Sequence, residues 1–154
     1  MAYHVSLTQV ASQTTAVVRR QAGLHELATV IPQACGDVWA FIRSSYLPQP
    51  GRNLAVYLDD EGHLECGVEV AQAFAGNGQV VCSSTPAGMV ATAVHLGPYD
   101  RLGEAHTAIH QWCAAQGHVL IRPCWEVYGH WHDDPAKLRT DVYSLVQTIG
   151  ESRV

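Results

Sequence analysis

The sequence has few charged residues and no long apolar run, and both features exclude classes of function. Only 15% of the 154 residues are charged, and the nine Lys and Arg residues form no basic run, so direct nucleic-acid binding is not expected. No apolar segment approaches the ~20 residues of a transmembrane helix, so no membrane partner is expected. Motifs for dinucleotides, for a serine nucleophile and for zinc proteases are also missing, and we expect no cofactor and no bound metal.

The five cysteines are scattered and include no CxxC pair. Together with the lack of a signal-peptide pattern, this predicts reduced thiols in a cytoplasmic protein. Most of these cysteines are expected to be small buried side chains. The 47% hydrophobic content and the length predict one globular domain over residues 1–154 with a sizeable core.

Hydrophobic periodicity predicts eight strands and two helices. The first helix is expected from Ile31 to Tyr46, with Pro32 in its first turn, and the second between Asp100 as N-cap and Gly117 as stop. The strands are expected over 3–10, 14–20, 53–59, 63–70, 79–83, 89–96, 124–131 and 138–146.

The two halves of the chain share one order of elements: strand, helix, strand, strand. Pseudo-repeats are therefore expected over about 3–71 and 88–147, with NLAVYLDDEG aligned to CWEVYGHWHDD. Two such units can join their strands into one antiparallel sheet, with each helix packed on its apolar face. The sequence thus predicts an α+β fold made of duplicated strand-helix-strand-strand units.

Glu126 interrupts the otherwise apolar and aromatic segment CWEVY, residues 124–128. A buried carboxylate needs a partner or takes up a proton. Alternation along the strand assigns Trp125 and Val127 to helix packing, which leaves Glu126 and Tyr128 on the opposite face with Tyr57, near the seam of the halves. A carboxylate among aromatic rings is typical of a binding site, and a glutamate facing solvent on an open sheet is the alternative.

The chain resembles the GyrI-like family. The resemblance rests on HLGPYDRLGEAHTAIHQW, then CWEVY, then DDPAKLRTDVYSLV, and more weakly on NLAVYLDDEG and CGVEV. Members are stand-alone relatives of the effector-binding domains of multidrug-responsive bacterial transcription regulators. The resemblance implies a groove between the halves that binds bulky, aromatic, often cationic molecules. It also implies Glu126 as the polar anchor and Tyr57, Tyr128 and Tyr143 as walls of a ligand-binding site. Unlike those regulators, the chain leaves no room for a DNA-binding helix-turn-helix domain.

Three functions stay open at this point. The first is binding, sequestration or sensing of xenobiotics. The second is a hydrolase that detoxifies reactive xenobiotics, with Glu126 and Tyr128 as candidate catalytic acid and base. The third is a protein-interaction module, for example one that modulates gyrase. The sequence leaves the natural ligand and the oligomeric state open.

Several of the nine histidines occur in spacings that can bind metals. His130 and His132 lie in HWHDD, but a polar strand end entering a loop is the simpler interpretation. His106 and His110 are four residues apart on the second helix without the HExxH glutamate, and we expect both on a solvated helix face. A cysteine–histidine nucleophile has no local sequence feature in its favour.

Overall fold

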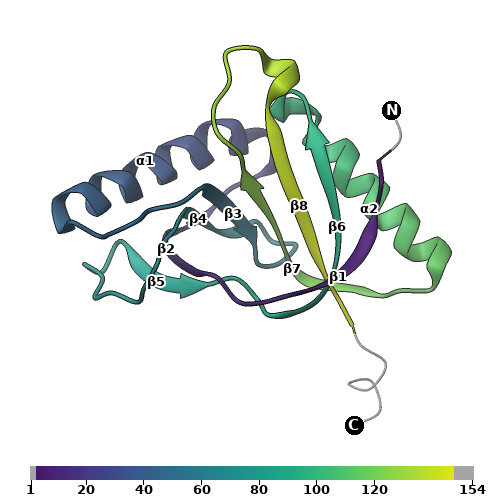
Figure 1. Cartoon of the computed structure of the whole chain (residues 1–154), viewed down its shortest axis with the longest axis horizontal. Coiled ribbons are helices and arrows are strands. Elements are labelled where there is room, and N and C mark those ends of the chain that lie inside the picture. Colours follow the sequence, from purple (N-terminus) through teal and green to yellow (C-terminus); the bar gives the residue numbers. More distant parts are fainter. Residues whose placement is uncertain (1–2, 148–154) are drawn as a thin grey trace, which may run out of the picture. The chain divides into compact units, whose positions relative to one another are not determined.

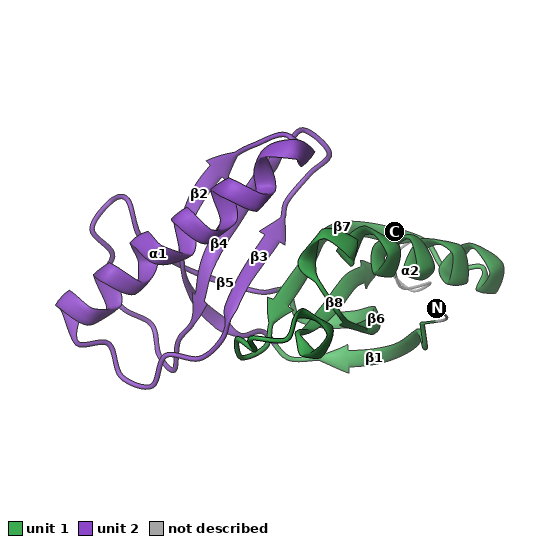
Figure 2. Ribbon diagram, turned by 90° about the horizontal axis from the view of Figure 1, so that it is seen from above, with its two compact units in different colours: residues 1–11, 86–154 green, residues 12–85 purple. Residues whose placement is uncertain are grey.

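The computed structural model describes residues 3–147, which form two compact units. Of the described residues, unit 1 comprises 3–11 and 86–147, and unit 2 comprises 12–85. Figure 2 colours unit 1 green and unit 2 purple. The chain therefore enters through a single strand of unit 1, builds the whole of unit 2, and then returns to complete unit 1.

Unit 2 is a four-stranded antiparallel sheet with one helix. The strands follow the order β3-β4-β2-β5. The helix α1 lies on the face that carries Asn53, because the indole N–H of Trp39 donates to the Asn53 Oδ1 at 2.7 Å. The elements are β2 (Thr14–Gln21), a 3₁₀ turn (Leu24–Glu26), α1 (Leu27–Ser45), β3 (Asn53–Tyr57), β4 (His63–Glu69) and β5 (Val81–Ser84).

Unit 1 repeats this plan with the strand order β1-β6-β8-β7, again antiparallel throughout. Figure 1 shows helix α2 running beside these strands. The elements are β1 (Ser6–Val10), β6 (Gly88–Leu96), a 3₁₀ turn (Tyr99–Arg101), α2 (Leu102–Gln116), β7 (Leu120–Tyr128), a 3₁₀ turn (Pro135–Lys137) and β8 (Arg139–Val146).

The predicted α+β class, the antiparallel pairing and the strand-helix-strand-strand order are confirmed in both units. The first strand was expected to belong to the first pseudo-repeat. β1 pairs with β6, with Ser6 opposite Thr92, and so belongs in space to the second half of the chain. In unit 2 the corresponding edge place beside β2 is taken by β5. Local sequence patterns carry no information about such long-range partners.

The helix boundaries correct two sequence predictions. Helix α1 begins at Leu27, so Pro32 lies inside the helix and not in its first turn. Its missing N–H removes one helical hydrogen bond, which the nineteen-residue helix tolerates. Asp100 lies in the 3₁₀ turn before α2, and the N-cap position is taken by Arg101 without a side-chain cap. The predicted stop at Gly117 is confirmed, with φ of 77° in the left-handed region.

The core of unit 1 forms where α2 packs on the sheet. Ile109 and Cys113 of α2 are almost fully buried, as are Ala93 of β6 and Val142 of β8. Burying one side chain of the size of isoleucine stabilises a fold by about 1.5–3 kcal/mol. The face of the sheet that carries Ala93 and Val142 is therefore the helix-bearing face, and this assignment positions the candidate site.

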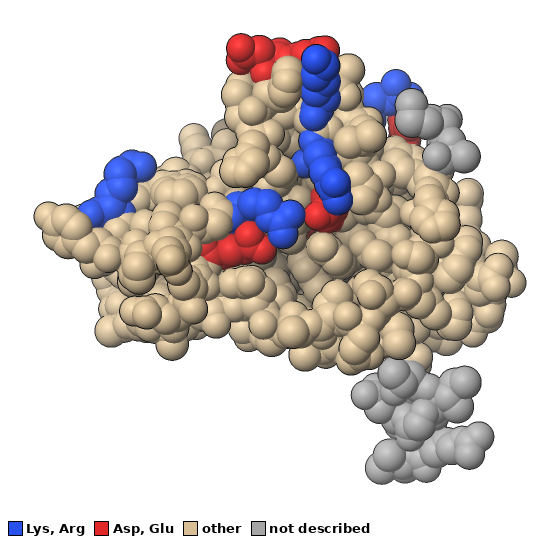
Figure 3. Space-filling model, viewed as in Figure 1, with Lys and Arg blue, Asp and Glu red and all other residues tan. Residues whose placement is uncertain are grey.

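The surface charges are sparse and largely paired. On the face shown in Figure 3, basic and acidic side chains lie next to one another. The structure contains several such ion pairs, among them Arg19–Glu65, Arg52–Glu69 and Arg139–Asp141. All five cysteines are free thiols. Within residues 3–147 no helix has both the length and the apolar character to cross a membrane.

Candidate functional site

The candidate site lies where the end of β7 meets helix α2. Cys124, Glu126 and Tyr128 are alternate residues of β7, so their side chains point to one face of the sheet. Glu126 lies opposite Val142 of the core and contacts His106 of α2, which places all three on the helix-bearing face. Two regular elements therefore hold these side chains, and no flexible loop contributes to their positions.

The carboxylate of Glu126 is buried, with the residue only 4% exposed, and it is hydrogen-bonded at both oxygens. The hydroxyl of Tyr128 donates to Oε1 at 2.6 Å, and the imidazole of His106 lies with Nε2 2.7 Å from Oε2. Hydrogen bonds to both carboxylate oxygens offset the large cost of removing a carboxylate from water. The glutamate inside an otherwise apolar strand is thus explained by hydrogen-bond partners at both of its oxygens.

His106 is the cationic partner of this cluster. Burial lowers the pKa of His106, but hydrogen bonds to Cys124 and Glu126 and the negative charge of Glu126 outweigh burial and raise the pKa to about 9. The imidazole is therefore protonated at neutral pH and forms an ion pair with the carboxylate. With 22% of its side chain exposed, His106 keeps one edge toward solvent.

Cys124 extends the cluster on the other side of His106. The guanidinium of Arg122 donates to the Cys124 sulfur at 2.9 Å, and the side chain of His106 also hydrogen-bonds this thiol. Residues 122 and 123 are extra relative to the partner strand, because Ile121 pairs with Leu145 and Cys124 with Ser144. A bulge of this kind re-aims neighbouring side chains, which explains how Arg122 reaches a residue only two positions away.

The predicted faces of β7 were wrong. Trp125 and Val127 do not pack under the helix; they lie on the face opposite to Glu126. Tyr143 lies directly across from Trp125 on β8, and the two rings stack with centroids 5.3 Å apart. Of the three tyrosines predicted as walls, Tyr128 therefore contacts Glu126, whereas Tyr143 faces away from it.

Tyr57 occupies the end of β3 in unit 2. It shares a strand face with Asn53, the partner of Trp39, and so lies on the face that bears α1. The prediction that placed Tyr57 on the face opposite to the helix was wrong in the same way as for β7. Tyr57 in unit 2 and Tyr128 in unit 1 thus each lie on the sheet face that bears the helix of their unit.

His106 was missed by sequence reasoning, which placed it with His110 on a solvated helix face. The structure separates the two, because His110 is exposed and His106 is half-buried against Glu126. The available signal was weak: His106 directly follows Ala105, at the edge of the apolar stripe of α2. Only the tertiary pairing of α2 with β7 reveals its partner.

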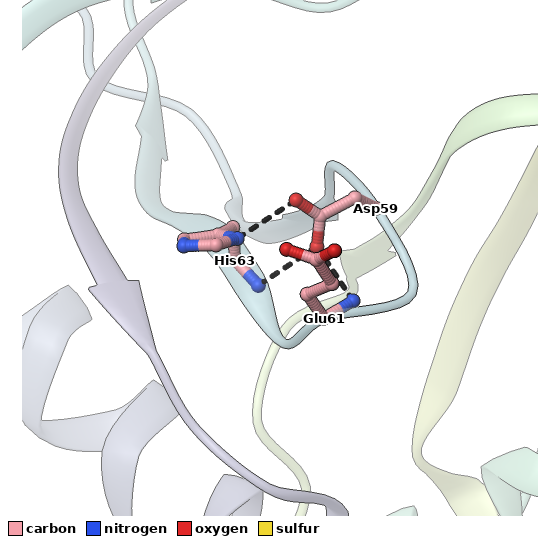
Figure 4. Close-up of side chains that lie close together, drawn as sticks. All are labelled: Asp59, Glu61 and His63. Carbon is pink, nitrogen blue, oxygen red and sulfur yellow. Dashed lines mark hydrogen bonds and ion pairs between the residues drawn. The ribbon is translucent and has the colours of Figure 1, made fainter.

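A second polar cluster lies in the turn between β3 and β4. Asp59, Glu61 and His63 offer ligand atoms within 4.8 Å of one another, and Figure 4 shows them around this turn. The Asp59 carboxylate accepts from the backbone N–H groups of Glu61 and His63 and lies 2.7 Å from the His63 imidazole. These contacts are those of an Asx turn that closes a hairpin, and the cluster needs no metal to account for it.

The other metal-type pattern, HWHDD, lies in the loop that follows strand β7. Strand β7 ends at Tyr128, so His130 and His132 lie in the following loop and are exposed. His132 instead accepts a hydrogen bond from the backbone N–H of Asp134. Among the described residues, these histidines do not belong to a group of three potential metal ligands within bonding reach.

Unit 1 also contains a shallow hollow of about 940 Å³ between its N-terminal segment and α2. Its lining includes Tyr3, Arg101, Glu104 and Trp112, and it includes neither Glu126 nor His106. Arg101 and Glu104 already form an exposed ion pair with each other. We therefore place the candidate site at the buried Glu126 cluster, where the chemistry converges, and not at this hollow.

Comparison with known proteins gives the family. A family model for the GyrI-like small molecule binding domain matches residues 4–147. This chain belongs to the GyrI-like family. Its resemblance to the family, inferred above from CWEVY and the flanking segments, is confirmed. No curated protein matches the sequence significantly.

Solved structures show that this GyrI-like chain shares its fold with several proteins of low sequence identity. The EcmrR C-terminal domain has a TM-score of 0.80 at 20% identity and covers 97% of this chain and 100% of its own. SAV2435 bound to tetraphenylphosphonium has a TM-score of 0.65 at 12% identity, with 99% and 98% covered. A hydrolase from Listeria innocua has a TM-score of 0.60 at 13% identity, with 93% and 91% covered.

Proposed function

We propose that this GyrI-like chain binds bulky aromatic small molecules, preferentially organic cations, at the Glu126 carboxylate. The observation that carries the proposal is a buried carboxylate held between Tyr128 and His106 in a small-molecule-binding domain. The tetraphenylphosphonium bound by SAV2435 supports a cationic ligand class. Of the three predicted wall residues, Tyr128 is the one that contacts this carboxylate, and binding in a cytoplasmic protein would serve sequestration or sensing of xenobiotics.

The preference for delocalised cations follows from the cost of desolvation. An organic cation that spreads its charge over aromatic rings loses less hydration on burial than an ammonium ion. The Tyr128 ring adds cation–π attraction and apolar contact area, and it already packs edge-on against Tyr99 with centroids 5.6 Å apart. A phosphonium or quaternary ammonium ion also donates no hydrogen bond, so it need not displace the Tyr128 hydroxyl from Glu126.

The ion pair with His106 modifies how such a cation binds. An incoming positive charge next to Glu126 is repelled by the imidazolium of His106, so binding favours the neutral imidazole and releases a proton. Because the pKa of His106 is about 9, affinity for cations should rise as pH increases from 7 toward 9. Neutral aromatic ligands should show no such rise.

A thermal-shift screen tests this function directly. A ligand that binds only the native state raises stability by RT ln(1 + [L]/Kd). The panel comprises tetraphenylphosphonium, neutral triphenylphosphine oxide and anionic tetraphenylborate. We expect the largest stabilisation with the phosphonium, a smaller one with the oxide and none with the borate. An equal response to all three, or a response to the borate alone, would refute charge-selective binding at Glu126.

The second candidate function is hydrolysis. The observation in its favour is the hydrogen-bonded series Tyr128–Glu126–His106, which places two proton donors on one buried carboxylate. In such an enzyme Glu126 would accept a proton from water and Tyr128 would protonate a leaving group. Steady turnover of a strained aromatic electrophile, abolished in Glu126→Gln, would favour hydrolysis over binding, whereas binding without turnover would exclude it.

A further inference from the structure

Cys124 differs from the other buried cysteines in the groups that contact its sulfur. Cys35 and Cys113 are 3% and 1% exposed. Burial raises the pKa of the Cys35 thiol to about 11, and burial also raises the pKa of the Cys113 thiol. Both thiols therefore stay protonated and inert. Cys124 instead contacts the guanidinium of Arg122 at 2.9 Å and the side chain of His106.

The contacts of Cys124 are those of an activated nucleophile. A positively charged side chain and an imidazole next to the sulfur are the groups that accompany cysteine nucleophiles in enzymes. His106 is in turn oriented by the Glu126 carboxylate at 2.7 Å. The three side chains thus form a nucleophile, a proton carrier and an orienting carboxylate, brought together from β7 and α2.

We propose that Cys124 captures electrophilic aromatic small molecules covalently, by conjugate addition to an α,β-unsaturated carbonyl group. A soft thiolate and a nearby proton donor are the two groups that this addition needs. The product is a thioether, which water does not cleave, so one chain captures one molecule. In one respect this rests on the proposed function: an aromatic small molecule must reach the helix-bearing face of β7.

The step balances without any further reagent. The sulfur of Cys124 forms a bond to the β-carbon, the carbon–carbon π bond breaks, and its electrons move to the carbonyl as an enolate. His106 then gives its proton to the α-carbon, so a thiolate, an imidazolium ion and an unsaturated carbonyl become a thioether and a neutral imidazole. The carbonyl is regenerated, and nothing is oxidised or lost.

The groups that face Cys124 define what its pH response should be. On β7 they are Arg122, Glu126 and Tyr128; from α2 it is His106; and the residue opposite on β8 is Ser144, which does not titrate. Loss of the His106 proton should therefore be the event that slows addition at high pH, because the enolate then lacks its proton donor.

The experiment uses the full chain with Cys82→Ser, since Cys82 is the one exposed cysteine among the five. The probe is benzylideneacetone, an aromatic unsaturated ketone, and intact-mass spectrometry follows the adduct at pH 7. We expect one adduct per chain, mapped to Cys124 by peptide analysis and missing in Cys82→Ser/Cys124→Ser. His106→Gln should slow addition by about tenfold or more, as general acid catalysis commonly contributes at least that much. His110→Gln, on the same helix, should not.

Two results would overturn the proposal. One is a Cys82→Ser chain that stays unmodified while Cys82 of the wild-type chain reacts. The other is addition at Cys124 with the same rate in His106→Gln, Arg122→Gln and the parent. Circular dichroism of each variant identifies loss of fold. Reversible binding of tetraphenylphosphonium to the same protein separates the two hypotheses: binding without an adduct refutes only covalent capture, and an adduct without phosphonium binding refutes only the proposed cation site.

Discussion

Replacing His106 by Gln should increase the affinity for organic cations. In the native chain the Glu126 carboxylate is already paired with the His106 imidazolium at 2.7 Å. Gln keeps a side-chain N–H that can donate to the carboxylate, but it carries no charge. The substitution thus removes the internal competitor of a cationic ligand and leaves the anchor in place.

The size of the gain follows from the charge that is removed. Two unit charges about 4 Å apart repel each other by about 4 kcal/mol at an effective dielectric constant of 20. Part of this repulsion is already relieved in the native chain, because His106 can release its proton. A gain of about 1.4 to 3 kcal/mol remains, which is a tenfold to about hundredfold increase in affinity for a cation.

Isothermal titration calorimetry at pH 7 with tetraphenylphosphonium provides the assay. The matched control is His110→Gln, one helical turn further along α2, whose side chain is exposed. We expect no change in that variant, and none for triphenylphosphine oxide in either. A fall in cation affinity in His106→Gln, at unchanged fold, would refute the placement of the ligand charge at Glu126.

Three further predictions concern stability and metal binding. Folding raises the pKa of His106 from 6.5 to about 9, so its ion pair contributes stability that is fully present below pH 6.5 and is lost as pH rises through about 9. The free energy of unfolding, measured with urea, should therefore fall by at most about 3 kcal/mol between pH 7 and 10. This fall should be absent in His106→Gln. Gly67→Ala should cost about 2 kcal/mol or more, since its methyl group would collide with the backbone of Ala16 on β2, and an unchanged melting temperature would contradict this. Asp59→Asn should lower the melting temperature by weakening the turn, equally with and without a chelator; a chelator-dependent difference would instead indicate a metal at Asp59, Glu61 and His63.

The sequence predicted most elements correctly because each has a strong local signal. The apolar stripe from Leu102 to Cys113 and the left-handed stop at Gly117 fixed α2 to within a few residues. A segment rich in Val and Thr identified strand β2. The partner of β1, in contrast, lies more than 75 residues away in the chain, and nothing in the sequence of residues 6–10 specifies it.

The faces of β7 were not predictable because both are buried. Trp125 is 3% exposed and Val127 is 4% exposed, yet Cys124 and Glu126 on the other face are equally covered. Alternation identifies a core face only when the opposite face meets water. Trp125 and Val127, the more hydrophobic residues, were therefore assigned to the helix, although α2 covers Cys124 and Glu126.

The sequence correctly placed Glu126 and Tyr128 on one face of a strand, but it did not reveal their partner His106. The family resemblance indicated the carboxylate, and strand periodicity correctly grouped it with Tyr128. His106 comes from another element, and its contact with Glu126 depends on how α2 lies over β7. The pairing of the Glu126 carboxylate with the His106 imidazolium depends on tertiary packing. The sequence therefore indicated a lone carboxylate, whereas the structure contains an ion pair.

The most direct test of the account compares two ligands in Glu126→Gln. The substitution keeps the shape of the side chain and removes the charge, and Glu61→Gln, an exposed glutamate in unit 2, is the matched control. Calorimetry at pH 9, where the His106 pair is half titrated, should show at least a tenfold loss of affinity for tetraphenylphosphonium, or about 1.4 kcal/mol. Triphenylphosphine oxide should lose less than about threefold, because ring contacts carry its binding. Equal losses for both ligands, with folding stability unchanged, would show that Glu126 is not the charge anchor of this protein.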